Sequence, residues 1–144
     1  MFYNAKNLKI DIDDTFANYI SFGKGTRNLI IIPGVGDGFK TVKGLAIPFS
    51  FMYKMFAKEY KVFVFSRRNV IKENFSTEDM ANEIIDHMGK LHIDKADIVG
   101  VSQGGMIAQY IAINAPEKVN KLVLAVTTAR TNDVLDTVIN DWID

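Results

Sequence analysis

Four short runs of consecutive apolar residues, separated by stretches of helical periodicity, constrain the fold of this chain more than any other feature. A strand covered on both faces has such a continuous run, whereas a strand with one solvent face alternates. Strands that alternate with helices predict a parallel sheet with right-handed crossovers and helices on both faces, an α/β architecture. The runs lie in Asn28–Ile32, Lys61–Phe65, Ala96–Val101 and Val119–Val126.

An antiparallel hairpin is expected before this series. Leu8–Asp13 alternates apolar and polar residues, and Thr15–Phe22 forms a second run after Asp13 and Asp14. Together with Asp11, these acids lack the ligand spacing and the glycine of a calcium loop, so turn chemistry explains them better. The sheet is therefore predicted to be mostly parallel with an antiparallel hairpin at its amino-terminal end.

The expected helices follow from apolar stripes and capping residues. Pro48 fits a first helical turn, and Ser76 begins a capping box. His87 lies at the edge of the stripe of the second helix, where we expect a hydrogen-bonded histidine. The four helices are predicted over about 48–59, from Ser76 through the stripe of Met80, Ile84, Met88 and Leu91, over Gln103–Asn114, and as an amphipathic helix over Thr131–Asp144.

Composition narrows the classes of function. The 144 residues fit one domain, and 17 basic against 17 acidic residues give no net charge to attract nucleic acid. The absence of Cys removes disulfides, thiolate catalysis and cysteine-ligated metal sites. No secretory signal or run of 18 apolar residues is present, so we expect a cytoplasmic chain without a membrane partner. Gly34–Gly38 lacks the third glycine of a dinucleotide fingerprint, and no cofactor is predicted.

The strongest functional signal is a Gly-x-Ser-x-Gly pentapeptide, Gly100 to Gly104, between a buried strand and a helix with an apolar face. A serine at a sharp strand-to-helix turn crowds its neighbours, so Gly100 and Gly104 relieve clashes that a Cβ atom would cause. The helix that begins at Gln103 directs free amide N–H groups toward the same place, where they can stabilise an oxyanion. The alternative is that Ser102 only caps this helix. The ordered series of strand, turn and helix favours a nucleophile.

With these residues in place, the sequence resembles the α/β-hydrolase fold family over nearly its whole length. By this resemblance Ser102 is the nucleophile, and the backbone N–H groups of Val35 and Gln103 form the oxyanion hole. The resemblance rests on the hairpin, Pro33-Gly34-Val35-Gly36, the loop Ser66–Asn69, the turn at Ser102, and Ala115–Val119 leading into Leu122–Leu124. Pro33 stands where the family usually has a histidine. Arg67 and Arg68 are expected to be solvated loop charges.

The rest of the family's catalytic triad is missing from this sequence. The triad runs serine, acid, histidine along the chain, but His87 and His92 both precede Ser102. Asp133 and Asp136 follow the fourth apolar run, yet an acid without an imidazole cannot activate a serine. We expect an incomplete α/β-hydrolase fold in which residues 1–130 form the first part of the core and residues 131–144 begin the lid. The acid and the histidine are expected beyond residue 144, and the chain alone is expected to be inactive or very slow.

Two functions stay open. The first is part of a serine hydrolase for a small carboxylic ester or related acyl substrate, and the second is a non-catalytic, short α/β-hydrolase-like protein for binding or assembly. In both cases the last parallel strand has an unpaired outer edge, and exposed apolar edges invite pairing with another chain. Self-association is therefore expected through strand 119–126 or helix 131–144.

Overall fold

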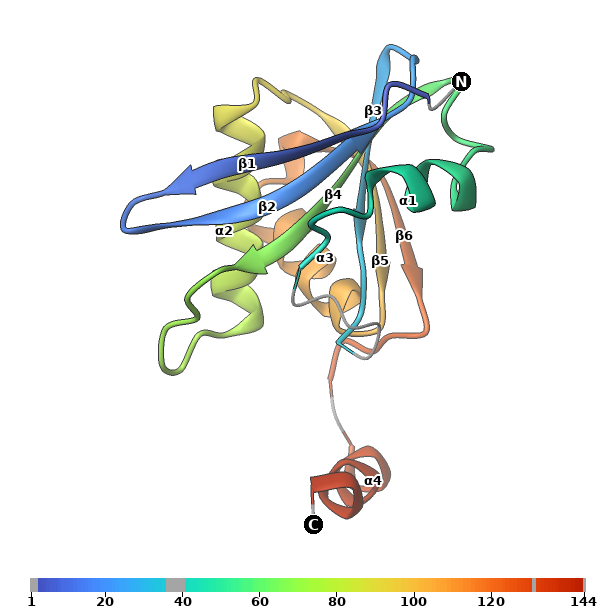
Figure 1. Cartoon of the computed structure of the whole chain (residues 1–144). Coiled ribbons are helices and arrows are strands. Elements are labelled where there is room, and N and C mark those ends of the chain that lie inside the picture. The colour runs from blue at the N-terminus through green and yellow to red at the C-terminus, as the bar shows by residue number, and fades with distance from the viewer. Residues whose placement is uncertain (1–2, 36–40, 131, 144) are drawn as a thin grey trace.

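A single mixed sheet organises the molecule, and its strands lie in the order β1-β2-β4-β3-β5-β6 (Figure 1). The computed structural model describes residues 3–35, 41–130 and 132–143. β3 to β6 run parallel, and β2 is antiparallel to both β1 and β4. The predicted hairpin and parallel sheet are thereby confirmed. The strands are β1 Lys6–Ile12, β2 Thr15–Phe22, β3 Arg27–Ile32, β4 Tyr60–Arg68, β5 Ala96–Val101 and β6 Val119–Ala125.

Helices cover both faces of the sheet, as the sequence predicted. α2 (Thr77–Lys90) and α3 (Gln103–Asn114) lie on one face, and α1 (Ala46–Met52) lies on the other (Figure 1). α2 begins with a complete capping box, because the Ser76 hydroxyl accepts a hydrogen bond from the Asp79 N–H while the Asp79 carboxylate accepts one from the Ser76 N–H. A short 3₁₀ turn, Pro116–Lys118, leads into β6.

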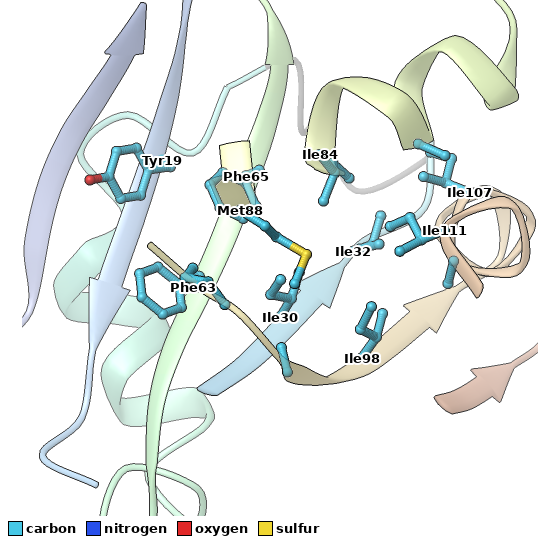
Figure 2. Close-up of a cluster of buried hydrophobic side chains, with 14 of the residues drawn as sticks. Tyr19, Ile30, Ile32, Phe63, Phe65, Ile84, Met88, Ile98, Ile107 and Ile111 are labelled. Atoms are coloured by element: carbon cyan, nitrogen blue, oxygen red, sulfur yellow. The ribbon is translucent and has the colours of Figure 1, made fainter. Parts of the chain in front are cut away.

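The core consists of two apolar layers, one on each side of the sheet. In the larger layer, side chains of α2 and α3 meet alternate residues of the strands. Figure 2 shows Met88 of α2 reaching toward Ile30 of β3, beside Ile98 of β5. The second layer places Val42 and Phe49 against the opposite face. Both faces of β3, β4 and β5 are therefore covered, which explains the continuous apolar runs.

The first helix is shorter than predicted. The sequence indicated residues 48–59, but α1 ends at Met52 and turns follow up to β4. The bonds in these turns include i→i+3 links such as Phe56 N–H to Tyr53 O, and the Ala57 carbonyl accepts the Lys24 N–H at 2.9 Å. The β2–β3 connection also packs closely on this segment, since a Cβ atom on Gly25 would lie 1.9 Å from the Glu59 carbonyl oxygen, so tertiary contacts set the path of the chain after Met52.

β4 is longer than predicted and includes part of what the sequence indicated as a polar loop. Arg68 pairs with Ala17 of β2, so the strand continues through Ser66, Arg67 and Arg68. Arg68 is only 5% exposed and forms ion pairs with Asp14 at 3.0 Å and Glu83 at 3.7 Å. The expectation of a solvated Arg68 was wrong, because its two carboxylate partners come from the hairpin turn and α2.

A polar cluster joins the parallel strands at their amino ends. The Asp97 carboxylate of β5 accepts three hydrogen bonds. The donors are Arg27 of β3 at 2.7 Å, Tyr60 of β4 at 2.8 Å and Asn120 of β6 at 2.6 Å. Burial alone would raise the pKa of Asp97, but the hydrogen bonds from Asn120, Tyr60 and Arg27 lower it below its usual value. These contacts hold the sheet together at the end opposite Ser102.

α4 (Asp133–Ile143) lies apart from the sheet, past the carboxyl ends of the strands (Figure 1). It is not placed along β6, whose outer edge is the last in the strand order. Val123 and Leu124 of β6 are 52% and 42% exposed, and Val134 of α4 is also exposed. Within the ranges that the structure describes, no helix has the length and apolar character needed to cross a bilayer.

Candidate active site

The site forms at the carboxyl ends of the four parallel strands β3, β4, β5 and β6, which lie side by side. Ser102 follows β5, and Gly34 follows β3 after Pro33. Arg67 is the last residue but one of β4, and Thr127 follows β6. Parallel strands bring their carboxyl ends to the same edge, so segments that are distant in sequence converge there.

Ser102 occupies a strained backbone conformation, with φ 54° and ψ −123°. Non-glycine residues rarely adopt a positive φ, and such strain persists only where the surroundings impose it. Here the Ser102 N–H donates to the Ala125 carbonyl at 2.9 Å, and the Ser102 carbonyl accepts from Gly105 N–H and Thr127 Oγ1. Backbone contacts on both sides therefore hold the turn in place.

Ser102 is an exposed residue, and its hydroxyl makes no capping hydrogen bond to α3. This separates it from Ser76, which occupies the same position before α2 and does cap its helix. The structure therefore does not support the alternative in which Ser102 serves as a helix cap. Gln103 is the first residue of α3, so its N–H has no partner within the helix.

The glycines around Ser102 are required by close approach. A Cβ atom on Gly104 would lie 2.0 Å from the Ile32 carbonyl oxygen, and one on Gly100 would lie 2.5 Å from the Gly104 carbonyl oxygen. A Cβ atom on Gly34 would lie 2.9 Å from the Ser102 Cβ atom. The turn after β3 therefore packs directly against Ser102, with Val35 as the next residue.

An open cavity of about 700 Å³ lies beside this turn. Arg67 extends toward it, and its Nη2 donates to Gln103 Oε1 at 3.0 Å and to the Pro33 carbonyl at 3.5 Å. The lining combines apolar side chains with amide, hydroxyl and guanidinium groups: Gly34, Val35, Thr41, Arg67, Arg68, Asn69, Ile71, Met80 and Gln103. The expectation that Arg67 is a solvated loop charge was wrong, since Arg67 is partly buried in this wall.

Burial shifts the pKa values of two charged groups, Arg67 of the cavity wall and Glu83 of α2. It lowers the pKa of Arg67, while the negative charge of Glu83 opposes that shift. Burial likewise raises the pKa of Glu83, and the Arg68 guanidinium opposes it. Sequence reasoning missed this arrangement because adjacent arginines at the end of a strand look the same whether they are buried or solvated.

Neither histidine lies at the site. His87 is 2% exposed in α2, where its Nδ1 hydrogen-bonds the Glu83 carbonyl and its ring packs on Phe65 with centroids 5.2 Å apart. Its Nε2 is buried without a partner among the described residues. His92 is exposed in the turn before β5, at the opposite end of that strand from Ser102.

The structure brings together Ser102, Gln103, Gly100, Gly104 and Val35, which are the site residues that the sequence singled out. Gly36, at the end of the expected oxyanion loop, lies outside the described residues. Asp133 and Asp136 lie in the first turn of α4, away from this edge of the sheet (Figure 1). In the part of the chain that is described, no group of three or more His, Asp or Glu side chains is arranged to hold a metal ion.

Comparison with known proteins points to one family. The family described as alpha/beta hydrolase fold matches residues 27–143. The chain is also similar to 3-oxoadipate enol-lactonase 2 of Acinetobacter baylyi, with 24% identity over 120 residues. That alignment covers 83% of this chain and 45% of the lactonase, so the chain spans about half the length of this relative.

Solved structures share the fold at low sequence identity. A hydrolase from Pseudomonas aeruginosa superposes with a TM-score of 0.72 at 18% identity, covering 98% of this chain and 53% of the other. The epoxide hydrolase CorEH superposes with a TM-score of 0.74 at 16% identity, covering 96% of this chain and 50% of the other. At such identities the likeness concerns the fold alone.

Proposed function

The chain belongs to the α/β-hydrolase fold family, and from that membership we propose that it carries the nucleophile and the oxyanion hole of a serine hydrolase. The substrate class is a small carboxylic ester or a related acyl compound. The single observation that carries this proposal is the backbone of Ser102, which has φ 54° in an exposed residue whose hydroxyl does not cap α3.

In the proposed reaction, Ser102 Oγ attacks the carbonyl carbon of the substrate, and the carbonyl oxygen becomes an oxyanion. The N–H groups of Gln103 and Val35 would donate to that oxygen, since both residues belong to the turns that meet at Ser102. Loss of one such donor costs about 10²–10³ in rate in other serine hydrolases. When the intermediate collapses, the bond to the leaving alcohol breaks and an acyl-enzyme remains, which water hydrolyses to the acid and free serine.

This reaction needs a base to take the serine proton and return it to the leaving alcohol. His87 is buried against Phe65 and His92 lies at the far end of β5, so neither fits that role. We propose that the histidine and its acid come from sequence outside residues 1–144. Without them, acylation rests on the oxyanion hole and on binding, which still accelerate a reaction about 10³–10⁴-fold over water.

Covalent labelling tests the nucleophile. Because no histidine lies beside Ser102 among the described residues, a fluorophosphonate probe in excess is expected to form one adduct on Ser102 slowly, detected by intact mass and peptide mapping after long incubation, and Ser102→Ala is expected to lose it. Ser76→Ala is the matched control, because Ser76 is also exposed before a helix but serves as a cap. This variant should keep the labelling rate and lose about 1 kcal/mol of unfolding free energy. Labelling that persists in Ser102→Ala would contradict the proposed nucleophile.

One observation favours a non-catalytic role in binding or assembly. Among the residues that the structure describes, no histidine lies near Ser102. A protein of this kind would form a stable oligomer and resist the fluorophosphonate even in excess and after long incubation, so the same labelling experiment distinguishes the two functions.

A further inference from the structure

The cavity beside Ser102 carries a positive charge that no carboxylate of the described residues contacts directly, although the negative charge of Glu83 acts on Arg67 from a greater distance. Two arginines line this cavity and none of its described lining residues is an acid. Arg68 is paired with Asp14 and Glu83, but Arg67 has no carboxylate within 4.0 Å among those residues. Charged side chains are rarely buried unless they are paired, because removal from water is costly. A partly buried guanidinium that faces an open cavity without a carboxylate in contact therefore suits an anionic ligand.

The hydrogen bonds of Arg67 leave most of its donors available. Nη2 donates to two neutral oxygens, Gln103 Oε1 and the Pro33 carbonyl. A guanidinium carries five N–H donors in a planar fork. Nη1 and Nε of Arg67 make no hydrogen bond to the described residues, so they can still bind a carboxylate. The two bonds to Gln103 and Pro33 also fix the plane of the fork, which lowers the entropy that binding would cost.

The position of Arg67 relates this charge to the proposed chemistry. Gln103 follows Ser102 directly, and Pro33 precedes the glycine that packs against Ser102. Arg67 touches both turns, so its guanidinium lies next to the place where the oxyanion would form. Val35, Ile71 and Met80 supply apolar surface in the same cavity. A short aliphatic chain ending in a carboxylate matches this combination.

We propose that Arg67 binds a carboxylate of the substrate, so that the preferred substrates are small esters or acyl compounds that carry an additional carboxylate. This inference rests on the proposed function for the role of Ser102, but the binding of an anion at Arg67 can be measured without any reaction. Arg67 is then a specificity-determining residue of the same site.

Equilibrium binding tests the anion site directly. NMR titration of the whole chain with glutarate, and with its neutral analogue glutaramide, is expected to show at least tenfold tighter binding of glutarate, with shifts at the Gln103 amide. Arg67→Gln should remove this preference, and Arg67→Lys should keep part of it because the charge remains without the fork. Lys72→Gln is the matched control, since it removes one positive charge from an exposed position outside the cavity. Equal binding of the two compounds, or a preference that survives in Arg67→Gln, would overturn the inference.

Protection from labelling links this site to Ser102. Glutarate, and not glutaramide, is expected to slow fluorophosphonate labelling of the wild-type protein, and the protection should vanish in Arg67→Gln. If glutarate binds at Arg67 but Ser102 is never labelled, the anion site stands and the hydrolase proposal fails. If Ser102 is labelled but glutarate neither binds preferentially nor protects, the hydrolase proposal stands and the anion site fails.

Discussion

At the scale of single residues, the site depends on one strained position. A positive φ at a serine costs of the order of 1–3 kcal/mol, and such strain is found at functional sites when the surroundings impose it. Around Ser102 the surroundings consist mainly of backbone: Ala125 O, Gly105 N and the segment near Gly34. Ser76, with an extended ψ of 170°, occupies the same position before α2 without strain. The two serines that precede α2 and α3 therefore differ in backbone angle, and only Ser76 caps its helix.

Substitution of Gly104 tests how closely this turn is packed. In Gly104→Ala the added Cβ atom would lie 2.0 Å from the Ile32 carbonyl oxygen, which belongs to a central strand and cannot move freely. We expect a loss of about 1–3 kcal/mol of unfolding free energy, or more, together with loss of Ser102 labelling. The measurement is urea unfolding followed by circular dichroism.

Gly89→Ala is the control for this prediction. Gly89 lies in α2, and nothing is within 4 Å of a Cβ atom built there. Alanine should therefore stabilise the protein by about 0.5–1 kcal/mol through helix propensity. Equal effects of the two substitutions would show that Gly104 is not held by close approach.

At the scale of elements, the attachment of α2 to the sheet includes a buried titratable group. His87 packs on Phe65 of β4 and lies in the apolar layer beside Met88. Burial lowers its pKa from 6.5 to about 4, with a smaller contribution from the Lys90 charge. The folded protein therefore keeps this ring neutral at pH values where the unfolded chain protonates it.

Because of His87, the free energy of unfolding should decrease as the pH is lowered from about 6.5 to about 4. In that range the unfolded chain binds a proton that the folded protein does not, so acid favours unfolding; above this range both states are neutral and the effect vanishes. Relative to His87→Leu, the wild type is expected to lose of the order of 3 kcal/mol between pH 7 and pH 4. Urea midpoints of both proteins across this range provide the measurement. Parallel pH profiles of the two proteins would refute the assignment to His87.

At the scale of the whole molecule, polar contacts join the parallel strands at their amino ends, and β6 forms one of the two open edges of the sheet. The Asp97 cluster joins β3, β4, β5 and β6 at their amino ends. β6 is nevertheless an edge strand with exposed Val123 and Leu124, and α4 does not lie along it. An exposed apolar edge is a template for pairing with another chain.

We expect this edge to drive self-association. Sedimentation velocity at micromolar concentration should show a species larger than a monomer, and Val123→Lys should shift it toward the monomer because edge lysines oppose pairing. Ile113→Lys is the matched control, because Ile113 is also an exposed apolar residue but belongs to α3 and not to the edge strand. A stable monomer of the wild type would contradict this prediction, and so would equal effects of the two lysines.

The amino-acid sequence by itself determined the order of strands and helices along the chain, the antiparallel hairpin and the turn at Ser102. Each of these follows from residues that are close in the chain: apolar periodicity, capping residues and glycines two positions from a serine. The tertiary structure alone decided where α1 ends, how far β4 extends, and that Arg68 is buried and Arg67 partly buried. Those outcomes depend on groups from distant segments, such as the Lys24 N–H, the Ala17 backbone and the Glu83 carboxylate. Their approach is a property of packing, which no local pattern encodes.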